Sequence, residues 1–260
     1  MDANLIQALG DELFAALADC RSLEPLTSRH PGLTLADAYA IQQALATHRF
    51  AAGERLVGHK IGVTSQAVMN LLGVDQPDFG QLLASMVRHE GSAVPLAGLI
   101  APRAEAEVAF VLRHGLRGPG VTTADVLRAA DYVMPCFEIV DSRIRDWKIR
   151  IQDTVADNAS CGLLLLGDAR ADPRELDLAQ APMVLEKNDE RVSMSTGACV
   201  QGSPLNAVAW LANTLGRLGM GIEAGEIVLS GSQSPLVPVV PGDRLRCTVG
   251  GLGTACVRFE

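Results

Sequence analysis

The sequence has little positive charge, and this shortage narrows the classes of partner that it can bind. Its 260 residues include 22 Lys and Arg against 30 Asp and Glu, which gives a formal net charge of -8 and a pI near 5.2. The basic residues are scattered and form no run. Nucleic acids and anionic membranes both attract clustered Lys and Arg. We therefore expect neither of them as a partner.

Long apolar runs are also missing. No stretch of about 18 consecutive apolar residues occurs, and the first segment, MDANLIQALGDEL, has acidic residues where a signal peptide would have Lys or Arg. These absences predict a cytoplasmic protein without a membrane span. With 48% hydrophobic residues, the chain can bury a full core, either as one large domain or as a large domain with a small appendage.

Several motifs of common enzyme classes are absent too. The chain has no phosphate-binding P-loop, no GxGxxG and no GxSxG, and its five His show no HxxxH spacing. Its six Cys lie far apart and form no CxxC pair, and several of them stand among apolar neighbours. We interpret all six as small buried hydrophobic residues of a reducing compartment, and we expect none of them to be catalytic.

The segment RAEAEVAF, Arg103–Phe110, places two acidic residues inside an otherwise apolar strand pattern. Alternate side chains of a strand share a face, so Glu105 and Glu107 lie together. A solvated sheet face would explain an acidic pair, but the neighbouring residues are small alanines rather than long polar side chains. A cation bound between the two carboxylates would offset their repulsion. Such a site needs a third oxygen ligand.

A second apolar strand, MPCFEIVDS (Met134–Ser142), supplies that ligand in Glu138. It follows a helix that we expect Thr123 to cap. Taken alone, Glu138 has the ordinary interpretation of an edge-strand charge. Adjacent strands lie about 4.8 Å apart, however, so Glu138 can meet Glu105 and Glu107 at one ion. Three carboxylates without His or Cys favour a hard cation, Mg²⁺ or Mn²⁺, with open positions for substrate oxygens and water.

The remaining periodicities predict a mixture of helices and strands. We expect helices over residues 3–20, from Thr34 with its capping partner Asp37, from Ser65 to Gly73 and from Ser203. We expect strands at 55–65, 161–167 and 226–232, and two more after a turn at 241–243. A hairpin over 183–194 should turn near Asn188, and residues 74–80 should form a loop. No internal repeat or low-complexity linker divides the chain.

These segments together resemble the fumarylacetoacetate hydrolase superfamily. The likeness is carried by Glu105-x-Glu107, Glu138, the SGS stretch at 230–232 and the VPGD turn that precedes GGLGTACVRF. Within the superfamily, the segments GHKIGVTS, LGVDQPDFG, RAEAEVAF, SRIRDWKIRIQDTVADNASCG and PLNAVAWLANTLG resemble the 2-hydroxypenta-2,4-dienoate hydratases (2-oxopent-4-enoate hydratases) of aromatic meta-cleavage pathways. The likeness covers nearly the whole chain.

The resemblance implies an α+β fold. Its main part is a mostly β, roll-like catalytic domain over residues 74–260, behind a small N-terminal α/β portion over residues 1–73. The resemblance also implies that Glu105, Glu107 and Glu138 hold a divalent metal, in agreement with the strand-face argument.

Three further residues gain roles only through the resemblance, which implies that Lys60 and Asp78 are catalytic and that Ser160 binds substrate. Each has an ordinary local interpretation as well. Lys60 would be a solvated strand lysine, Asp78 a turn acid after a proline, and Ser160 a hydroxyl at the start of a strand. From the local sequence alone we would favour these ordinary interpretations.

The implied activity is the addition of water to a 2-hydroxydienoate substrate. The related 4-oxalocrotonate decarboxylases, which act on a similar metal-chelating 2-oxo acid, stay an alternative. A catalytically silent subunit that supports a partner enzyme also stays an alternative. Such a subunit would be expected to lack a metal ligand or Lys60, and this sequence has all of them. Asp78 favours the hydratase, because the decarboxylases of the family carry an apolar residue there. We also expect a homo-oligomer able to associate with the decarboxylase. Its size and the length of the substrate's tail stay open.

Overall fold

A computed structural model describes all 260 residues. The α-helices are α1 (Ala3–Ala18), α2 (Leu26–Arg29), α3 (Leu35–Ala51), α4 (Gln66–Leu72), α5 (Thr123–Ala129), α6 (Ile151–Ala156) and α7 (Pro204–Arg217). The strands are β1 (Leu56–Gly62), β2 (Asp78–Leu83), β3 (Val87–His89), β4 (Ala93–Val94), β5 (Arg103–Leu112), β6 (Ala130–Val140), β7 (Cys161–Leu166), β8 (Pro182–Lys187), β9 (Glu190–Thr196), β10 (Ile227–Leu229), β11 (Val237–Pro238), β12 (Arg244–Val249) and β13 (Gly253–Phe259).

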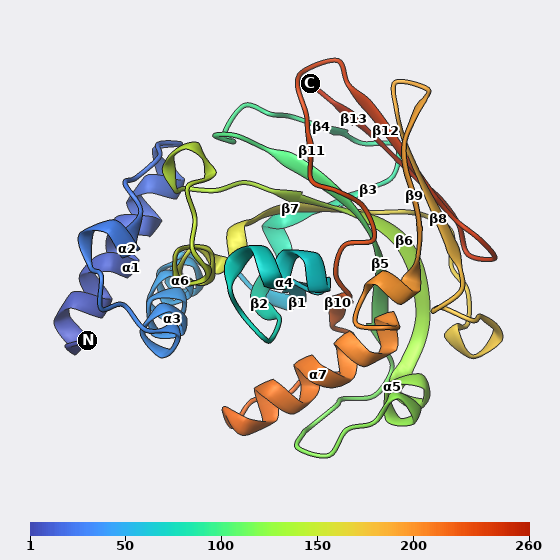
Figure 1. Ribbon diagram of the computed structural model, residues 1–260, viewed down its shortest axis with the longest axis horizontal. Coiled ribbons are helices and arrows are strands. Elements are labelled where there is room, and N and C mark those ends of the chain that lie inside the picture. Colours follow the sequence, from blue (N-terminus) through green and yellow to red (C-terminus); the bar gives the residue numbers. More distant parts are fainter.

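Two sheets organise the molecule. The larger has the order β2-β1-β10-β5-β6-β7-β3, with β11 paired to the beginning of β5, and the smaller has the order β4-β13-β12-β8-β9. The smaller sheet packs beside β6, while α5 and α7 lie together at one end of the long strands β5 and β6 (Figure 1). The N-terminal helices α1 to α3 gather with α6, on the side of the molecule away from β8 and β9 (Figure 1), and α4 connects β1 to β2 along the chain.

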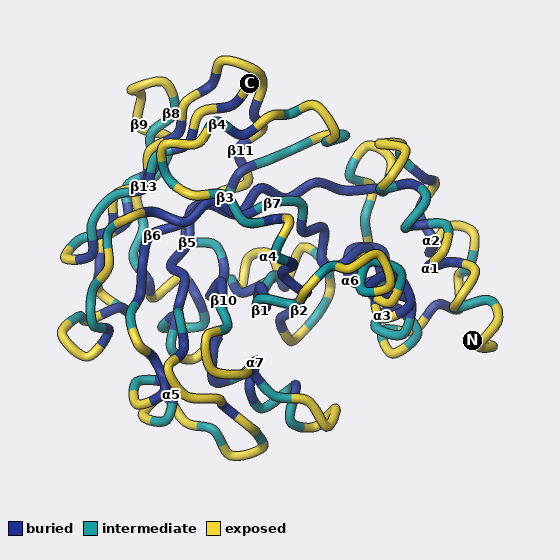
Figure 2. Tube along the Cα trace, turned by 180° about the vertical axis from the view of Figure 1, so that it is seen from behind, coloured by how far each residue is buried: buried dark blue, intermediate teal, exposed yellow.

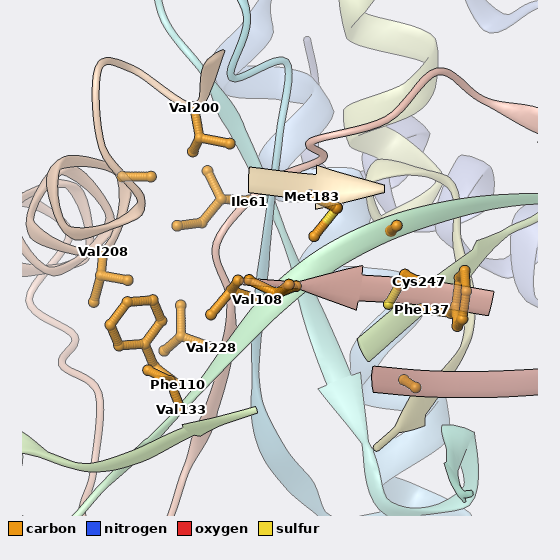
Figure 3. Close-up of a cluster of buried hydrophobic side chains, with 14 of the residues drawn as sticks. Ile61, Val108, Phe110, Val133, Phe137, Met183, Val200, Val208, Val228 and Cys247 are labelled. Carbon is orange, nitrogen blue, oxygen red and sulfur yellow. The ribbon is translucent and has the colours of Figure 1, made fainter. Parts of the chain in front are cut away.

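The largest hydrophobic core lies between the two sheets and α7. It contains Val108 and Phe110 of β5, Phe137 of β6, Val208 of α7 and Cys247 of β12 (Figure 3). The traces of β5 and β6 are buried along most of their length, and exposed residues gather in the turns and on the outer helices (Figure 2). The centre of the larger sheet is therefore covered on both faces.

A second core joins the N-terminal helices. Leucines four residues apart on α1 pack with Ile41 and Leu45 of α3 and with residues of α6. Helix α3 begins with the predicted capping box: Asp37 N donates to Thr34 Oγ1, and Thr34 N donates to the Asp37 carboxylate. The amphipathic pattern of this region is thus confirmed as packing.

Three element boundaries differ from the sequence-based predictions. The N-cap of α5 is Thr122 rather than Thr123, because the Thr122 side chain closes a capping box with the first turn. Strand β2 begins at Asp78, inside the loop predicted over 74–80, because pairing with β1 extends the chain there. Strand β6 already begins at Ala130, directly after α5.

The architecture is α+β, as predicted, and strands hold about as many residues as α-helices. Strand β1, from the first 73 residues, pairs with β2 and β10 and is part of the larger sheet. The division of the chain at residue 73 stays a prediction. None of the helices combines the length and the hydrophobicity that crossing a membrane requires.

Candidate active site

The two acidic strands pair directly and bring their carboxylates together. In the antiparallel register of β5 and β6, Glu105 lies opposite Glu138, and Glu107 lies opposite Cys136 on the same face. Carboxylate oxygens of the three glutamates all lie within 4.8 Å of one another. Glu107 is 1% exposed and Glu138 is 0% exposed. A solvated sheet face is therefore excluded for this cluster.

The opposite face of β5 explains why the neighbours are alanines. Ala104 and Ala106 belong to the main core with Val108 and Phe110, while Ala109 joins a separate apolar cluster on the glutamate side. Since both faces of the strand are packed, small residues fit where longer polar ones would not.

Several oxygens of the glutamate cluster have no hydrogen-bond partner in the protein. Glu107 Oε2 accepts a hydrogen bond from Gly231 N at 2.8 Å, but Glu107 Oε1 and Glu138 Oε2 have no partner, and Glu138 Oε1 has only an ion pair with Lys60 at 3.2 Å. Buried carboxylates without partners are costly, and an all-oxygen donor set suits a hard divalent cation. The three glutamates therefore fit a metal such as Mg²⁺ or Mn²⁺.

The burial and the mutual repulsion of the three carboxylates raise their pKa values. Burial raises the pKa of Glu105 to about 7, and the nearby Glu138 carboxylate adds to the effect. Burial also raises the pKa of Glu107 well above its usual range, again with help from Glu138. For Glu138, burial raises the pKa although the Lys60 ammonium opposes it. Without a cation the protein holds protons here at a pH where free glutamates are ionised.

Lys60 lies beside this cluster rather than in solvent. It is 3% exposed, its Nζ lies 3.2 Å from Glu138 Oε1 in an ion pair without hydrogen-bond geometry, and it donates a hydrogen bond to Ala159 O at 3.0 Å. Burial alone would lower the pKa of Lys60, but the carboxylates of Glu138 and Asp78 outweigh it and raise the pKa above its ordinary value. Lys60 is therefore a buried cation at neutral pH, and the interpretation as a solvated lysine is wrong.

Asp78 is the first residue of β2 and pairs across the sheet with Gly62 of β1. It is 2% exposed, its Oδ1 has no hydrogen-bond partner, and burial raises its pKa. A Cβ atom at Gly62 would lie 2.3 Å from Asp78 Oδ1 and 3.2 Å from Lys60 Nζ. A larger residue at this position would therefore displace the Asp78 carboxylate from where it lies. Sequence reasoning missed Gly62, although a glycine inside a strand is a known signal of close approach.

Ser160 ends a short turn of helix over Asn158–Ser160, directly before β7, and is buried. Its hydroxyl lies 3.0 Å from Thr154 Oγ1. Ser160, Lys60, Asp78 and Glu105 all line one cavity of about 190 Å³. The structure thus brings every predicted site residue to this cavity or to the glutamate cluster at its wall.

The rest of the cavity wall is largely apolar. Its apolar residues come from β1, α4, the segment after β6 and the segment before β11, and they include Val68, Leu72, Ile149 and Leu236. A larger open hollow of about 900 Å³ shares Leu72, Asp78 and Ile149 with the cavity.

The cysteines follow the prediction only in part. Cys136, Cys161 and Cys247 are buried, as expected, and all six thiols are free. Cys20 and Cys199 are exposed, because Cys20 follows the end of α1 and Cys199 lies in a surface turn. None of the six lines the cavity.

Comparison with known proteins defines the class. The family model "Fumarylacetoacetate (FAA) hydrolase C-terminal" matches residues 53–260, and the chain belongs to the fumarylacetoacetate hydrolase family. It is 54% identical over 260 residues to a 2-hydroxyhexa-2,4-dienoate hydratase of Comamonas testosteroni, covering 99% of this chain and 98% of the relative. It is 57% identical over 221 residues to a 2-hydroxypent-2,4-dienoate hydratase of Pseudomonas putida, covering 85% of this chain and 100% of the relative. The predicted resemblance is confirmed.

A solved structure shares the complete fold. The 4-oxalocrotonate decarboxylase from Pseudomonas putida G7, complexed with magnesium and adipate, superposes with a TM-score of 0.97 at 37% sequence identity, over 100% of this chain and 99% of that chain. The fold alone therefore does not identify the activity, because relatives named as hydratases and a solved structure named as a decarboxylase both match this chain over most of its length.

Proposed function

We propose that the protein is a metal-dependent hydratase that adds water to 2-hydroxypenta-2,4-dienoate and forms 4-hydroxy-2-oxopentanoate in the meta-cleavage degradation of aromatic compounds. The observation that carries this proposal is the buried Asp78 carboxylate in the same cavity as Lys60 and Glu105. The names of relatives that are 54% and 57% identical support the substrate class.

Glu105, Glu107 and Glu138 would hold the metal, Mg²⁺ or Mn²⁺. Their unpartnered oxygens and their all-carboxylate chemistry suit such an ion. When bound, the ion supplies Lewis-acid stabilisation of negative charge on the oxygens of the substrate.

Lys60 and Ser160 would bind the anionic end of the substrate. The carboxylates of Glu138 and Asp78 raise the pKa of Lys60 in the metal-free chain, and the protonated Lys60 would attract the substrate carboxylate and the developing enolate from within the cavity. The Ser160 hydroxyl, already beside Thr154, is available to donate a hydrogen bond to the same carboxylate. Both groups fix the orientation of the diene toward Asp78.

Asp78 would orient and deprotonate the attacking water. The enol hydroxyl loses its proton and the terminal carbon of the diene gains one, which gives a ketone conjugated to an alkene; the water oxygen then adds at the carbon β to the ketone, and the proton lost by the water goes to the α carbon. The unpartnered Asp78 Oδ1 can accept a hydrogen bond from the attacking water and take its proton. Its raised pKa makes it a better base than an exposed aspartate, and the proton that it takes can be returned to the α carbon.

The decarboxylase is the second candidate, because a protein of that name shares the fold. Its substrate carries a second carboxylate, which Asp78 would repel by roughly 4 kcal/mol at about 4 Å with an effective dielectric constant near 20. Loss of CO₂ also needs no group that orients water. Asp78 therefore favours hydration.

Product analysis tests the proposal. Incubation of the Mg²⁺ or Mn²⁺ form with 2-hydroxypenta-2,4-dienoate should give a product heavier by one water, identified by mass spectrometry as 4-hydroxy-2-oxopentanoate. The variant Asp78→Asn should bind Mn²⁺ normally but lose this product. Full activity of Asp78→Asn would remove Asp78 from the reaction.

We further propose that the enzyme is a cytoplasmic homo-oligomer that can associate with the decarboxylase acting before it. Six free cysteines support a reducing compartment. Val192 and Met194 are exposed apolar residues on the edge strand β9, where a second copy could cover them. Light scattering of the purified protein, alone and mixed with the decarboxylase, tests both associations.

A further inference from the structure

Three successive residues before β7 have an unusual backbone. Asn158, Ala159 and Ser160 have φ values of 54°, 51° and 54°, and all three are buried. Residues other than glycine rarely adopt this left-handed conformation, and when they do it is usually as single residues. A run of three persists only if the surrounding structure enforces it, and such strain gathers at functional sites.

The turn supplies contacts that the proposed site uses. The Ala159 carbonyl accepts the hydrogen bond from Lys60 Nζ at 3.0 Å, and the next residue, Ser160, lines the cavity. The main chain of the turn also packs closely on β2, since a Cβ at Gly80 would lie 2.5 Å from Asn158 O. The turn therefore touches the strands that carry Lys60 and Asp78.

The Asn158 side chain links the turn to β2 by two hydrogen bonds. Its Oδ1 accepts a hydrogen bond from Gln81 N at 2.8 Å, and its Nδ2 donates one to Gln81 O at 2.9 Å. Gln81 is three positions along β2 from Asp78 in the sequence. One amide side chain thus fixes the distance between the turn and the strand of Asp78.

A buried ion pair holds the start of the turn. Arg143 Nε donates to Asp157 Oδ1 at 2.5 Å, and Arg143 N donates to Asp157 Oδ2 at 2.8 Å. The guanidinium also donates to Asp157 O at 2.8 Å and to Asp141 O at 2.6 Å. This fork of donors is specific to arginine, because the compact ammonium group of lysine cannot reproduce the spacing of donors on a planar guanidinium.

We propose that Asn158 and Arg143 are positioning residues of the enzyme: together they enforce the left-handed turn that aims the Ala159 carbonyl at Lys60 and places Ser160 in the cavity. Neither residue lines that cavity, so each acts through the turn. The inference rests on the proposed hydratase activity for its kinetic test, but the geometry of the turn does not depend on it.

The test compares two identical substitutions at left-handed asparagines. Asn158→Gly keeps a residue that accepts the positive φ and removes both side-chain hydrogen bonds. The control is Asn188→Gly in the β8–β9 hairpin, where Asn188 also has a positive φ and makes two side-chain hydrogen bonds, to Asp243 and to Arg244 N, far from the cavity in the other sheet. Melting temperature, Mn²⁺ affinity, kcat and KM for 2-hydroxypenta-2,4-dienoate are measured for both.

The kcat of Asn158→Gly should be on the order of 10- to 100-fold lower than that of the wild type. A loss of this size is expected when catalytic groups are displaced by up to about 1 Å. Its Mn²⁺ affinity should stay within about twofold of the wild type, because the glutamates come from β5 and β6 and not from the turn. Loss of a residue that supports the metal ligands would typically lower the affinity by about tenfold or more. Asn188→Gly should keep its kcat. Arg143→Lys should behave like Asn158→Gly. Wild-type kcat in Asn158→Gly would overturn the role of Asn158, and wild-type kcat in Arg143→Lys would overturn that of Arg143.

Hydrogen exchange tests the positioning role of Asn158 independently of the proposed hydratase activity. In Asn158→Gly, peptides that cover residues 157–162 and 58–62 should exchange faster than in the wild type, whereas in Asn188→Gly they should not change. If the wild type does not hydrate the dienoate, the proposed function fails and exchange alone decides the inference. Unchanged exchange in Asn158→Gly would then overturn it.

Discussion

Removal of the metal should leave a protein whose stability falls as the pH rises. The pKa of Glu105 is about 7 in the folded chain, against an ordinary value of 4.5, so the folded protein favours the protonated form. The stability that Glu105 contributes is fully present below about pH 4.5 and is lost as the pH rises through about 7. Glu107 and Glu138, whose pKa values are also raised, act in the same direction.

The size of the effect follows from the pKa. A rise from 4.5 to about 7 corresponds to a loss of about 3 kcal/mol in the free energy of unfolding by about pH 8 from Glu105 alone. For a protein of this size, that loss lowers Tm by about 6–12 °C. A divalent cation bound by the three ionised carboxylates should reverse the loss, so added metal should stabilise the protein much more at pH 8 than at pH 5.

The assay is urea unfolding of exhaustively chelated protein at about pH 5 and about pH 8, with and without excess Mg²⁺ or Mn²⁺. Glu107→Gln is the matched control, since it keeps the shape of the side chain and removes one charge. In this variant the metal-free protein should lose less stability at high pH, and added metal should stabilise it little. Equal stabilisation of both proteins by metal, or a metal-free wild type whose stability does not depend on pH, would refute the assignment of the metal site.

Three further predictions concern single residues. Gly62→Ala should lower kcat on the order of 10- to 100-fold with Mn²⁺ affinity unchanged, because its Cβ would displace Asp78 and Lys60; a normal kcat would show that the close approach is unimportant. Ser160→Ala should raise KM by roughly 10-fold or more through the lost hydrogen bond to a charged substrate, with a smaller effect on kcat, and an unchanged KM in steady-state assays would exclude this contact. Iodoacetamide should label the exposed Cys20 and Cys199 without loss of activity; inactivation that substrate prevents would reveal a catalytic thiol.

The glutamate cluster was predictable because strand periodicity is a local property. The alternation in RAEAEVAF fixes the face of Glu105 and Glu107, and the small neighbours indicate packing on both sides. Glu138 needed only the assumption that two successive acidic strands pair, and the observed register places it directly opposite Glu105.

Lys60 and Asp78 could not be found in this way, because their burial depends on segments distant in the sequence. Lys60 meets a carbonyl 99 residues away, at Ala159. Asp78 looked like a turn residue because the sequence around it is rich in Pro, Asp and Gly, and only pairing with Gly62 makes it the start of a strand. The family resemblance supplied both residues where local patterns favoured ordinary interpretations.

Arg143 and Asn158 escaped the sequence analysis for a related reason. The segment around Arg143 is highly charged and is typical of a solvated loop, yet Asp157 and two carbonyls bury its guanidinium. Nothing in the local sequence indicates three successive left-handed residues without glycine. Such a turn is enforced by tertiary contacts, which periodicity does not report.

The central claim is that the chain is a hydratase rather than a decarboxylase, and a two-substrate experiment tests it most directly. The Mg²⁺ or Mn²⁺ form is given 2-hydroxypenta-2,4-dienoate and 4-oxalocrotonate in separate reactions, and dienoate absorbance and CO₂ release are followed. We expect rapid loss of the dienoate and very little CO₂ from 4-oxalocrotonate. Brisk CO₂ release with no loss of the dienoate would contradict the claim.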